Sequence, residues 1–135
     1  MKNKNLSGGL FAAKPTPLAL KETSLSNQIM VWLYSRGIYN DRLNAGKVET
    51  KRGNWITLCK PGTPDRFAII RGQIVFIEVK KRGKTATAEQ RIKHDELREH
   101  GAIVLVVDSL DDFIPKMKEI RATIEQTARV PQLYD

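Results

Sequence analysis

The sequence contains very little cysteine and histidine, and this scarcity excludes several kinds of protein. Cys59 is the single cysteine among the 135 residues, so no disulfide bond can form within the chain. His94 and His100 are the two histidines, and together with Cys59 they are too few to ligate a structural zinc cluster. We therefore expect neither a disulfide scaffold nor a zinc-stabilised domain.

Long hydrophobic runs are also lacking. No apolar stretch approaches the roughly 18 residues that a membrane-spanning helix needs. The first residues, MKNKNLSGGLFAAK, lack the apolar core of a secretion signal. The composition, 41% hydrophobic and 28% charged, is that of a globular protein, and the length suits one domain. We expect a cytoplasmic protein with no membrane partner.

Acidic residues are in deficit, and the excess of positive charge is localised. The chain has 23 basic and 15 acidic residues, a formal net charge of +8. Residues 42–100 carry fourteen of the basic and seven of the acidic side chains, whereas residues 101–135 carry four and six. A basic middle segment predicts a polyanionic partner, with nucleic acid first and an anionic membrane second. The alternative is a solvated basic face with no ligand.

Hydrophobic periodicity predicts a mixed α/β chain. Residues 1–15 have no apolar period and are expected to be a mobile arm. An apolar stripe from Leu25 to Leu33 has a helical period and predicts a helix that begins near Thr16-Pro17 and ends at Gly37. The further expected elements are an irregular stretch through 44–46, strands at 55–59, 66–70, 74–79 and 103–107, a capped helix at 87–100, a helical stretch from 109 that Pro115 breaks or restarts, and a tail at 129–135.

Two carboxylates are expected to meet at one end of a predicted hairpin. If Arg71-Gly72 forms a two-residue loop, Asp65 lies directly opposite Glu78. If the loop also includes Gln73, Glu78 moves one place out of register with Asp65. Like charges opposed across a sheet are destabilising, so a shared proton, a basic neighbour or a divalent cation must offset their repulsion.

Other polar side chains are expected at the same strand end. Lys80 follows Glu78 on the same face of the strand, because side chains alternate. Gln90, in the first turn of the following helix, is close enough in sequence to return to this edge. Two carboxylates that bind Mg²⁺, together with an ammonium group, suit the hydrolysis of phosphodiester bonds.

These residues resemble a known family. The set consists of GTPD at 62–65, IEVK at 77–80, TAEQ at 87–90 and RLNAG at 42–46, preceded by a helix with Glu22 near its start. In this order it is similar to the motifs of the PD-(D/E)XK nucleases, and specifically of the VRR-NUC family. A bare PD…ExK pattern is weak, but the ordered set over some ninety residues is specific.

The resemblance implies a fold, a cofactor and roles for individual residues. It implies an αβββαβα nuclease domain over residues 16–128, with a central mixed sheet flanked by helices. Asp65 and Glu78 would bind Mg²⁺ or Mn²⁺ with the main-chain carbonyl of Val79. Lys80 would position or activate the attacking water, and Gln90 would brace the site.

The resemblance also implies supporting residues and a substrate. Glu22 matches a first-helix glutamate that assists metal binding, and Arg42 and Asn44 would support the site or the substrate. Lys81, Arg82 and Lys84 are expected to contact phosphates. Small members of the family, from phages and bacteria, resemble Holliday-junction resolvases that act as homodimers on four-way DNA junctions, whose approximate two-fold symmetry suits a symmetric dimer.

Simpler interpretations stay open for several of these residues. Asp65 could be a turn residue after Pro64, Gln90 only a capping-box partner, and Glu22 a complement to a helix dipole. His94 and His100 are expected at the surface. For the whole protein, the alternatives to a junction resolvase are a nickase, a flap or restriction-like endonuclease of the same fold, and a DNA-binding accessory protein without catalysis.

Overall fold

The structure, a computed structural model, describes residues 24–129. This part of the chain contains three helices and six strands. Along the chain they are α3 (Leu25–Ser35), β1 (Tyr39–Arg42), β2 (Lys47–Glu49), β3 (Trp55–Thr57), β4 (Arg66–Ile70), β5 (Gln73–Val79), α4 (Ala88–Glu99), β6 (Ile103–Val107) and α5 (Leu110–Ala128).

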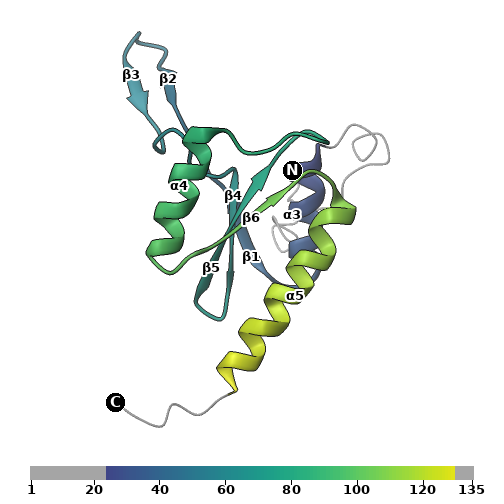
Figure 1. Cartoon of the computed structure of the whole chain (residues 1–135). Helices are drawn as coiled ribbons and strands as arrows, with labels where there is room; N and C mark the ends of the chain where they lie inside the picture. Colours follow the sequence, from purple (N-terminus) through teal and green to yellow (C-terminus); the bar gives the residue numbers. More distant parts are fainter. Residues whose placement is uncertain (1–23, 130–135) are drawn as a thin grey trace, which may run out of the picture.

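Four of the strands form a mixed sheet between two layers of helices. The strand order is β1-β4-β5-β6, with antiparallel pairs except for the parallel pair β5–β6. Helix α4 covers one face of the sheet, while α3 and α5 cover the other (Figure 1). Without β2 and β3, the described elements run α, β, β, β, α, β, α, which is the predicted order.

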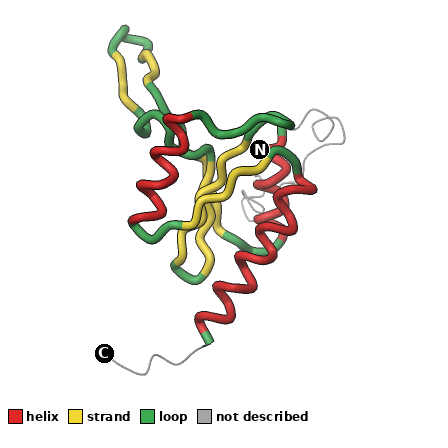
Figure 2. Tube along the Cα trace, in the orientation of Figure 1, coloured by secondary structure: helices red, strands yellow, loops and turns green. Residues whose placement is uncertain are grey.

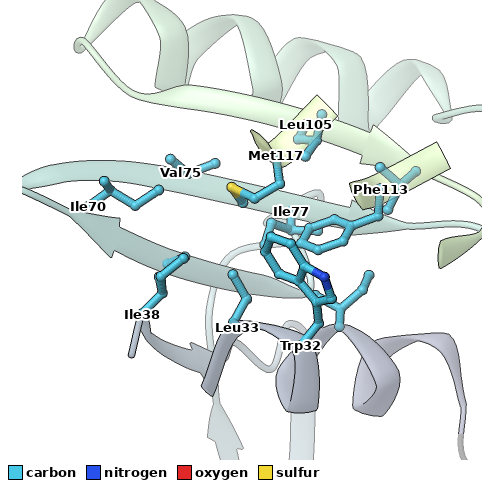
Figure 3. Packing of buried hydrophobic residues seen from close by; sticks show 12 residues of the cluster. Trp32, Leu33, Ile38, Ile70, Val75, Ile77, Leu105, Phe113 and Met117 are labelled. Atoms are coloured by element: carbon cyan, nitrogen blue, oxygen red, sulfur yellow. The ribbon is translucent and has the colours of Figure 1, made fainter. Parts of the chain in front are cut away.

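The hydrophobic core lies between the sheet and the α3–α5 layer. Val75 and Ile77 of β5 are fully buried there, because alternate residues of the strand face the same side. Trp32 of α3 meets Phe113 of α5 edge to face, with ring centroids 5.4 Å apart (Figure 3). This packing holds the strand that carries Glu78 rigidly between the two helical layers.

The β4–β5 hairpin has the two-residue loop of the first predicted register. Arg71 and Gly72 both have positive φ angles, 48° and 80°, as a type I′ turn requires. Ile70 pairs with Gln73, and the ladder continues to Arg66 opposite Ile77. The same register places Asp65 opposite Glu78, as predicted.

The first strand of the sheet differs from the prediction. The segment predicted as a strand at 55–59 contributes β3, which ends at Thr57 and pairs with β2 in a separate two-stranded sheet. The sheet strand is instead β1, whose sequence Tyr-Asn-Asp-Arg contains residues that strands usually avoid. It lies at an edge and pairs with β4, so its polar side chains reach solvent more easily than in a central strand. We call β2, β3 and their connection the β-ribbon (residues 47–57); it extends away from the body of the protein (Figure 2).

Two helices also differ from the predictions. Helix α3 begins at Leu25 because Ser24 is extended and its side chain accepts a hydrogen bond from the backbone of Asn27. Helix α5 continues through Pro115, because burial of Phe113 and Met117 on one face outweighs the one hydrogen bond that proline removes. No helix within residues 24–129 is long and apolar enough to cross a membrane.

Candidate active site

Asp65 and Glu78 meet at the end of the β4–β5 hairpin. Asp65 Oδ2 accepts a hydrogen bond of 2.7 Å from the backbone N–H of Val79. The Asp65 carboxyl group also lies close enough to the Glu78 carboxyl group to raise the pKa of Glu78. The backbone carbonyl of Asp65 accepts from Leu43 N–H at 2.8 Å, which ties the turn to the end of β1. The predicted pair of carboxylates is therefore present in the structure.

The turn before Asp65 is held against α4 by a close backbone approach. Gly62 has a φ of +85°, and a Cβ atom at this position would lie 3.0 Å from the carbonyl oxygen of Glu89. Thr63 Oγ1 donates to the carbonyl of Lys60 at 2.6 Å and closes the turn. Glycine is needed here both for its conformation and for the lack of a side chain. The contact sets the position of Asp65 relative to the helix that carries Gln90.

The Glu78 carboxyl is poorly hydrated and resists ionisation. Its side chain is 2% exposed. Burial is the largest cause of a pKa raised to about 8, the hydrogen bond and negative charge of Asp65 raise it further, and Lys80 opposes the shift. Without a cation, the Glu78 carboxyl group therefore keeps its proton at neutral pH.

His94 lies directly beneath Glu78, contrary to the prediction that it is a surface residue. Its Nε2 is 3.2 Å from Glu78 Oε1, and both residues are 2% exposed. Burial, and then the charge of Arg98, lower the pKa of His94, which favours a neutral imidazole that shares a hydrogen bond with the Glu78 carboxyl group. Ile92, two residues earlier in α4, is 71% exposed. The spacing of four residues between Gln90 and His94 was the signal that both share one helix face.

Gln90 forms the predicted capping box and also contacts Lys80. Its Oε1 accepts from the backbone N–H of Thr87 at 2.9 Å, and its own N–H donates to Thr87 Oγ1 at 3.2 Å, which completes the predicted capping box. The same Oε1 accepts from Lys80 Nζ at 2.9 Å. The start of α4 thus fixes the ammonium group of Lys80 beside the two carboxyl groups.

A basic cleft opens beside this cluster. It has a volume of about 480 Å³. Its charged lining residues are Arg42, Asp65, Lys80, Lys81, Arg82 and Asp108. Asp108, which sequence reasoning missed, follows β6 and accepts from Gly83 N–H at 3.0 Å, so it anchors the basic loop after β5. The signal for it was an aspartate directly after a continuous apolar strand.

Two of the predicted residues lie outside the cleft lining, and a third is not described by the structure. Asn44 is exposed outside the cleft lining, and its carbonyl accepts from Cys59 N–H at 2.8 Å, so it shapes the base of the β-ribbon. Lys84 lines a separate cavity with His94 and Arg98. Glu22 lies outside the described residues.

The donor set suits a hard divalent cation. Within residues 24–129, no group of three or more His, Cys, Asp and Glu side chains converges as a metal site. Mg²⁺ is commonly held by one or two carboxylates and keeps several waters, so Asp65, Glu78 and a main-chain carbonyl are a sufficient set. Release of the proton from Glu78 would free its carboxylate to bind the cation together with Asp65. The residues therefore fit Mg²⁺ or Mn²⁺.

Comparison with known proteins gives no match: no family model and no curated protein is significantly similar to this sequence. The functional argument therefore rests on the residues and geometry of the cleft.

Proposed function

We propose that this protein is a metal-dependent DNA endonuclease of the PD-(D/E)XK type. The observation that carries the proposal is the meeting of Asp65 and Glu78 beside Lys80 at the end of a basic cleft. An acid pair alone would be weak support, because acidic clusters are common. A buried acid pair next to a fixed ammonium group, within a surface that attracts polyanions, is typical of phosphodiester hydrolysis.

The side chains divide the chemistry between them. A bound Mg²⁺ or Mn²⁺ would supply Lewis-acid polarisation of the phosphate and a more acidic water. Asp65, Glu78 and the Val79 carbonyl would hold that ion. Lys80, whose ammonium is oriented by Gln90, would position the attacking water or stabilise negative charge on the phosphate.

The remaining basic residues of the cleft would hold the DNA backbone. Arg42, Lys81 and Arg82 line the cleft beside Asp65 and have exposed side chains. Cations at this position neutralise phosphates on either side of the one being cleaved. Binding is therefore expected to weaken with salt.

The fold is compatible with this proposal. The order α, β, β, β, α, β, α with a mixed sheet is what the resemblance to VRR-NUC nucleases implies, although the same order is not specific to them. Asp65 directly precedes β4 and Glu78 lies in β5, the two central strands of the sheet. These features support a nuclease core over the described residues.

A four-way DNA junction is the proposed substrate, with a homodimer as the active form. A row of apolar side chains crosses three strands on the face that α4 covers in part. Tyr39, Ile69 and Ile74 are neighbours across β1, β4 and β5, and are 53%, 37% and 41% exposed. An exposed apolar row of this kind suits a symmetric contact between two copies.

Cleavage of labelled DNA tests the proposal. With Mg²⁺, wild-type protein should cut a four-way junction, and the variants Asp65→Asn and Glu78→Gln should lose at least about a thousandfold in rate, since each removes a charged ligand. The matched control Glu119→Gln, at an exposed position of α5, should keep the wild-type rate.

The same experiment separates the alternatives. Equal rates on junction, flap, nicked and linear duplex would contradict junction selectivity but keep the nuclease. DNA binding without any Mg²⁺-dependent cleavage would leave an accessory protein and overturn the enzymatic proposal.

A further inference from the structure

The β-ribbon exposes large apolar side chains that no other described segment covers. Trp55 is 65% exposed, Ile56 50% and Val48 43%. Val48 and Ile56 pair across the ribbon on one face, and Trp55 pairs with Glu49 on the other. Two-stranded ribbons are marginally stable in water by themselves, and exposed apolar groups on them indicate contact with a partner.

Hydrogen bonds at both ends give the β-ribbon a defined shape. At its base, Gly46 N–H donates to the carbonyl of Cys59 and Leu58 N–H donates to the carbonyl of Gly46, at 3.0 and 2.8 Å. At its tip, Thr50 N–H donates to the carbonyl of Asn54 at 2.7 Å, and Asn54 N–H donates to Thr50 Oγ1 at 3.1 Å. The β-ribbon is therefore a preformed projection.

The β-ribbon starts at the sheet edge that carries the candidate active site. It connects the end of β1 to the start of β4, so its base lies between Arg42, which lines the cleft, and Asp65. From this edge it extends past the start of α4, away from the body of the protein (Figures 1 and 2). A long polymer that is bound in the cleft can therefore also contact the β-ribbon.

The charge of the β-ribbon matches a nucleic acid. Its eleven residues include Lys47, Lys51 and Arg52 but a single acidic residue, Glu49. Lys51 and Arg52 are exposed at the tip, next to Trp55. A second copy of this chain is a poorer match for this surface, because a symmetric contact through the β-ribbon would bring the same three cations of each copy together.

We infer that the β-ribbon enters a groove of the DNA duplex that flanks the cleft. A major groove about 12 Å wide and about 8.5 Å deep admits a two-stranded ribbon, and strands of three residues, such as β2 and β3, extend about 10 Å. Lys51 and Arg52 contact the phosphate backbone, and Trp55 packs on the sugars or base edges. The inference rests on the proposed action on DNA and adds a second contact beyond the cleft.

Binding measured without cleavage tests the β-ribbon alone. Fluorescence anisotropy with a labelled duplex of about 20 base pairs in EDTA compares wild type with Lys51→Ala/Arg52→Ala and with Trp55→Ala. The double variant should bind about tenfold more weakly, and the slope of log K against log salt should become shallower by about 2, because two phosphate contacts are lost. Trp55→Ala should bind about tenfold more weakly as well.

The control removes equal charge elsewhere. Lys118→Ala/Arg129→Ala, at exposed positions of α5 and just beyond it, should change affinity less than twofold. A charge reversal, Lys51→Glu/Arg52→Glu, should bind more weakly than the alanine pair. Both outcomes together support a direct phosphate contact.

Two results would overturn the inference. One is that the β-ribbon variants bind duplex as tightly as the α5 control. The other is that Trp55→Ala converts a DNA-free dimer to a monomer in sedimentation, which would make a second copy the occupant. The nuclease proposal would fail on a separate measurement, namely if Mg²⁺-dependent cleavage were insensitive to Asp65→Asn. That result does not depend on how tightly the β-ribbon variants bind duplex.

Discussion

At the scale of single residues, the site depends on how a buried carboxyl is held. Glu78 contacts Asp65 on one side and His94 on the other, and its side chain is almost entirely buried. Leaving such a group charged and without partners is costly. Its neighbours therefore decide whether it binds a proton or a cation.

His94 is expected to position Glu78 through its Nε2–H group. His94→Leu removes the donor and should weaken Mn²⁺ binding by about tenfold or more, as loss of a residue behind a metal ligand commonly does. His94→Gln retains an N–H at a similar reach and should restore most of the affinity. Calorimetric titration with Mn²⁺ measures both, and equal affinities for the two variants would contradict the role.

The stability of the metal-free protein should fall as pH rises. The pKa of Glu78 is raised from its ordinary value of 4.5 to about 8, so this group favours folding fully below about pH 4.5 and loses that contribution as pH rises through 8. Urea unfolding with EDTA should give a lower midpoint at pH 8.5 than at pH 6. Glu78→Gln should reduce this difference, and an unchanged difference would assign the pH dependence to other groups.

Metal affinity should show the opposite pH dependence. A cation must displace the proton of Glu78, so the Mg²⁺ or Mn²⁺ affinity should rise by up to about tenfold per pH unit below pH 8. Titration of the protein with Mn²⁺ at several pH values measures this slope. A flat profile would mean that the cation does not replace this proton.

At the scale of elements, the turn before β4 couples the sheet to α4. The backbone of Gly62 packs against Glu89 and Lys93, and the first turn of α4 in turn carries Gln90. The two halves of the site, Asp65 on the turn and Gln90 on the helix, are therefore positioned by one backbone contact.

Gly62→Ala should lower the free energy of unfolding by more than the strain of its positive φ angle alone accounts for. Any alanine at a positive φ costs about 1–2 kcal/mol, and at Gly62 a further contact at 3.0 Å must be relieved, which adds about 1–3 kcal/mol. Gly101→Ala is the matched control, because Gly101 has a φ of +89° but open space around it. Equal unfolding free energies for the two variants would show that the contact with α4 does not contribute to stability.

At the scale of the whole molecule, two exposed surfaces have different characters. The row of Tyr39, Ile69 and Ile74 is apolar and lies on the sheet, whereas the β-ribbon is basic and projects from it. We assign the first to contact between two copies and the second to DNA. Such a division would let one dimer present two clefts to two strands.

The dimer proposal predicts a clear response to one substitution. Ile74→Asp places a charge in the apolar row and should shift a micromolar solution from dimer to monomer in sedimentation equilibrium, since an unpaired charge at an interface costs several kcal/mol. Ile92→Asp, on the exposed face of α4, is the control and should leave the mass unchanged. A wild-type monomer under these conditions would refute the dimer.

Local sequence determined those features that depend on local physics. The two-residue loop at Arg71-Gly72 is one of the two registers that the sequence allows, and the positive φ angles of both residues in the structure select it. The capping box at Thr87 follows from the residue types three positions apart. The charge of residues 42–100 likewise identified the basic cleft.

Only the tertiary structure decided which of several polar segments join the sheet and which side chains are buried. Tyr39–Arg42 becomes a strand because β4 offers it an edge, although its sequence is not strand-like. His94 is buried and Ile92 exposed because α4 is oriented by the Gly62 contact and the Lys80–Gln90 hydrogen bond. These outcomes depend on contacts between residues far apart in the chain, and such contacts leave no periodic signal in the sequence.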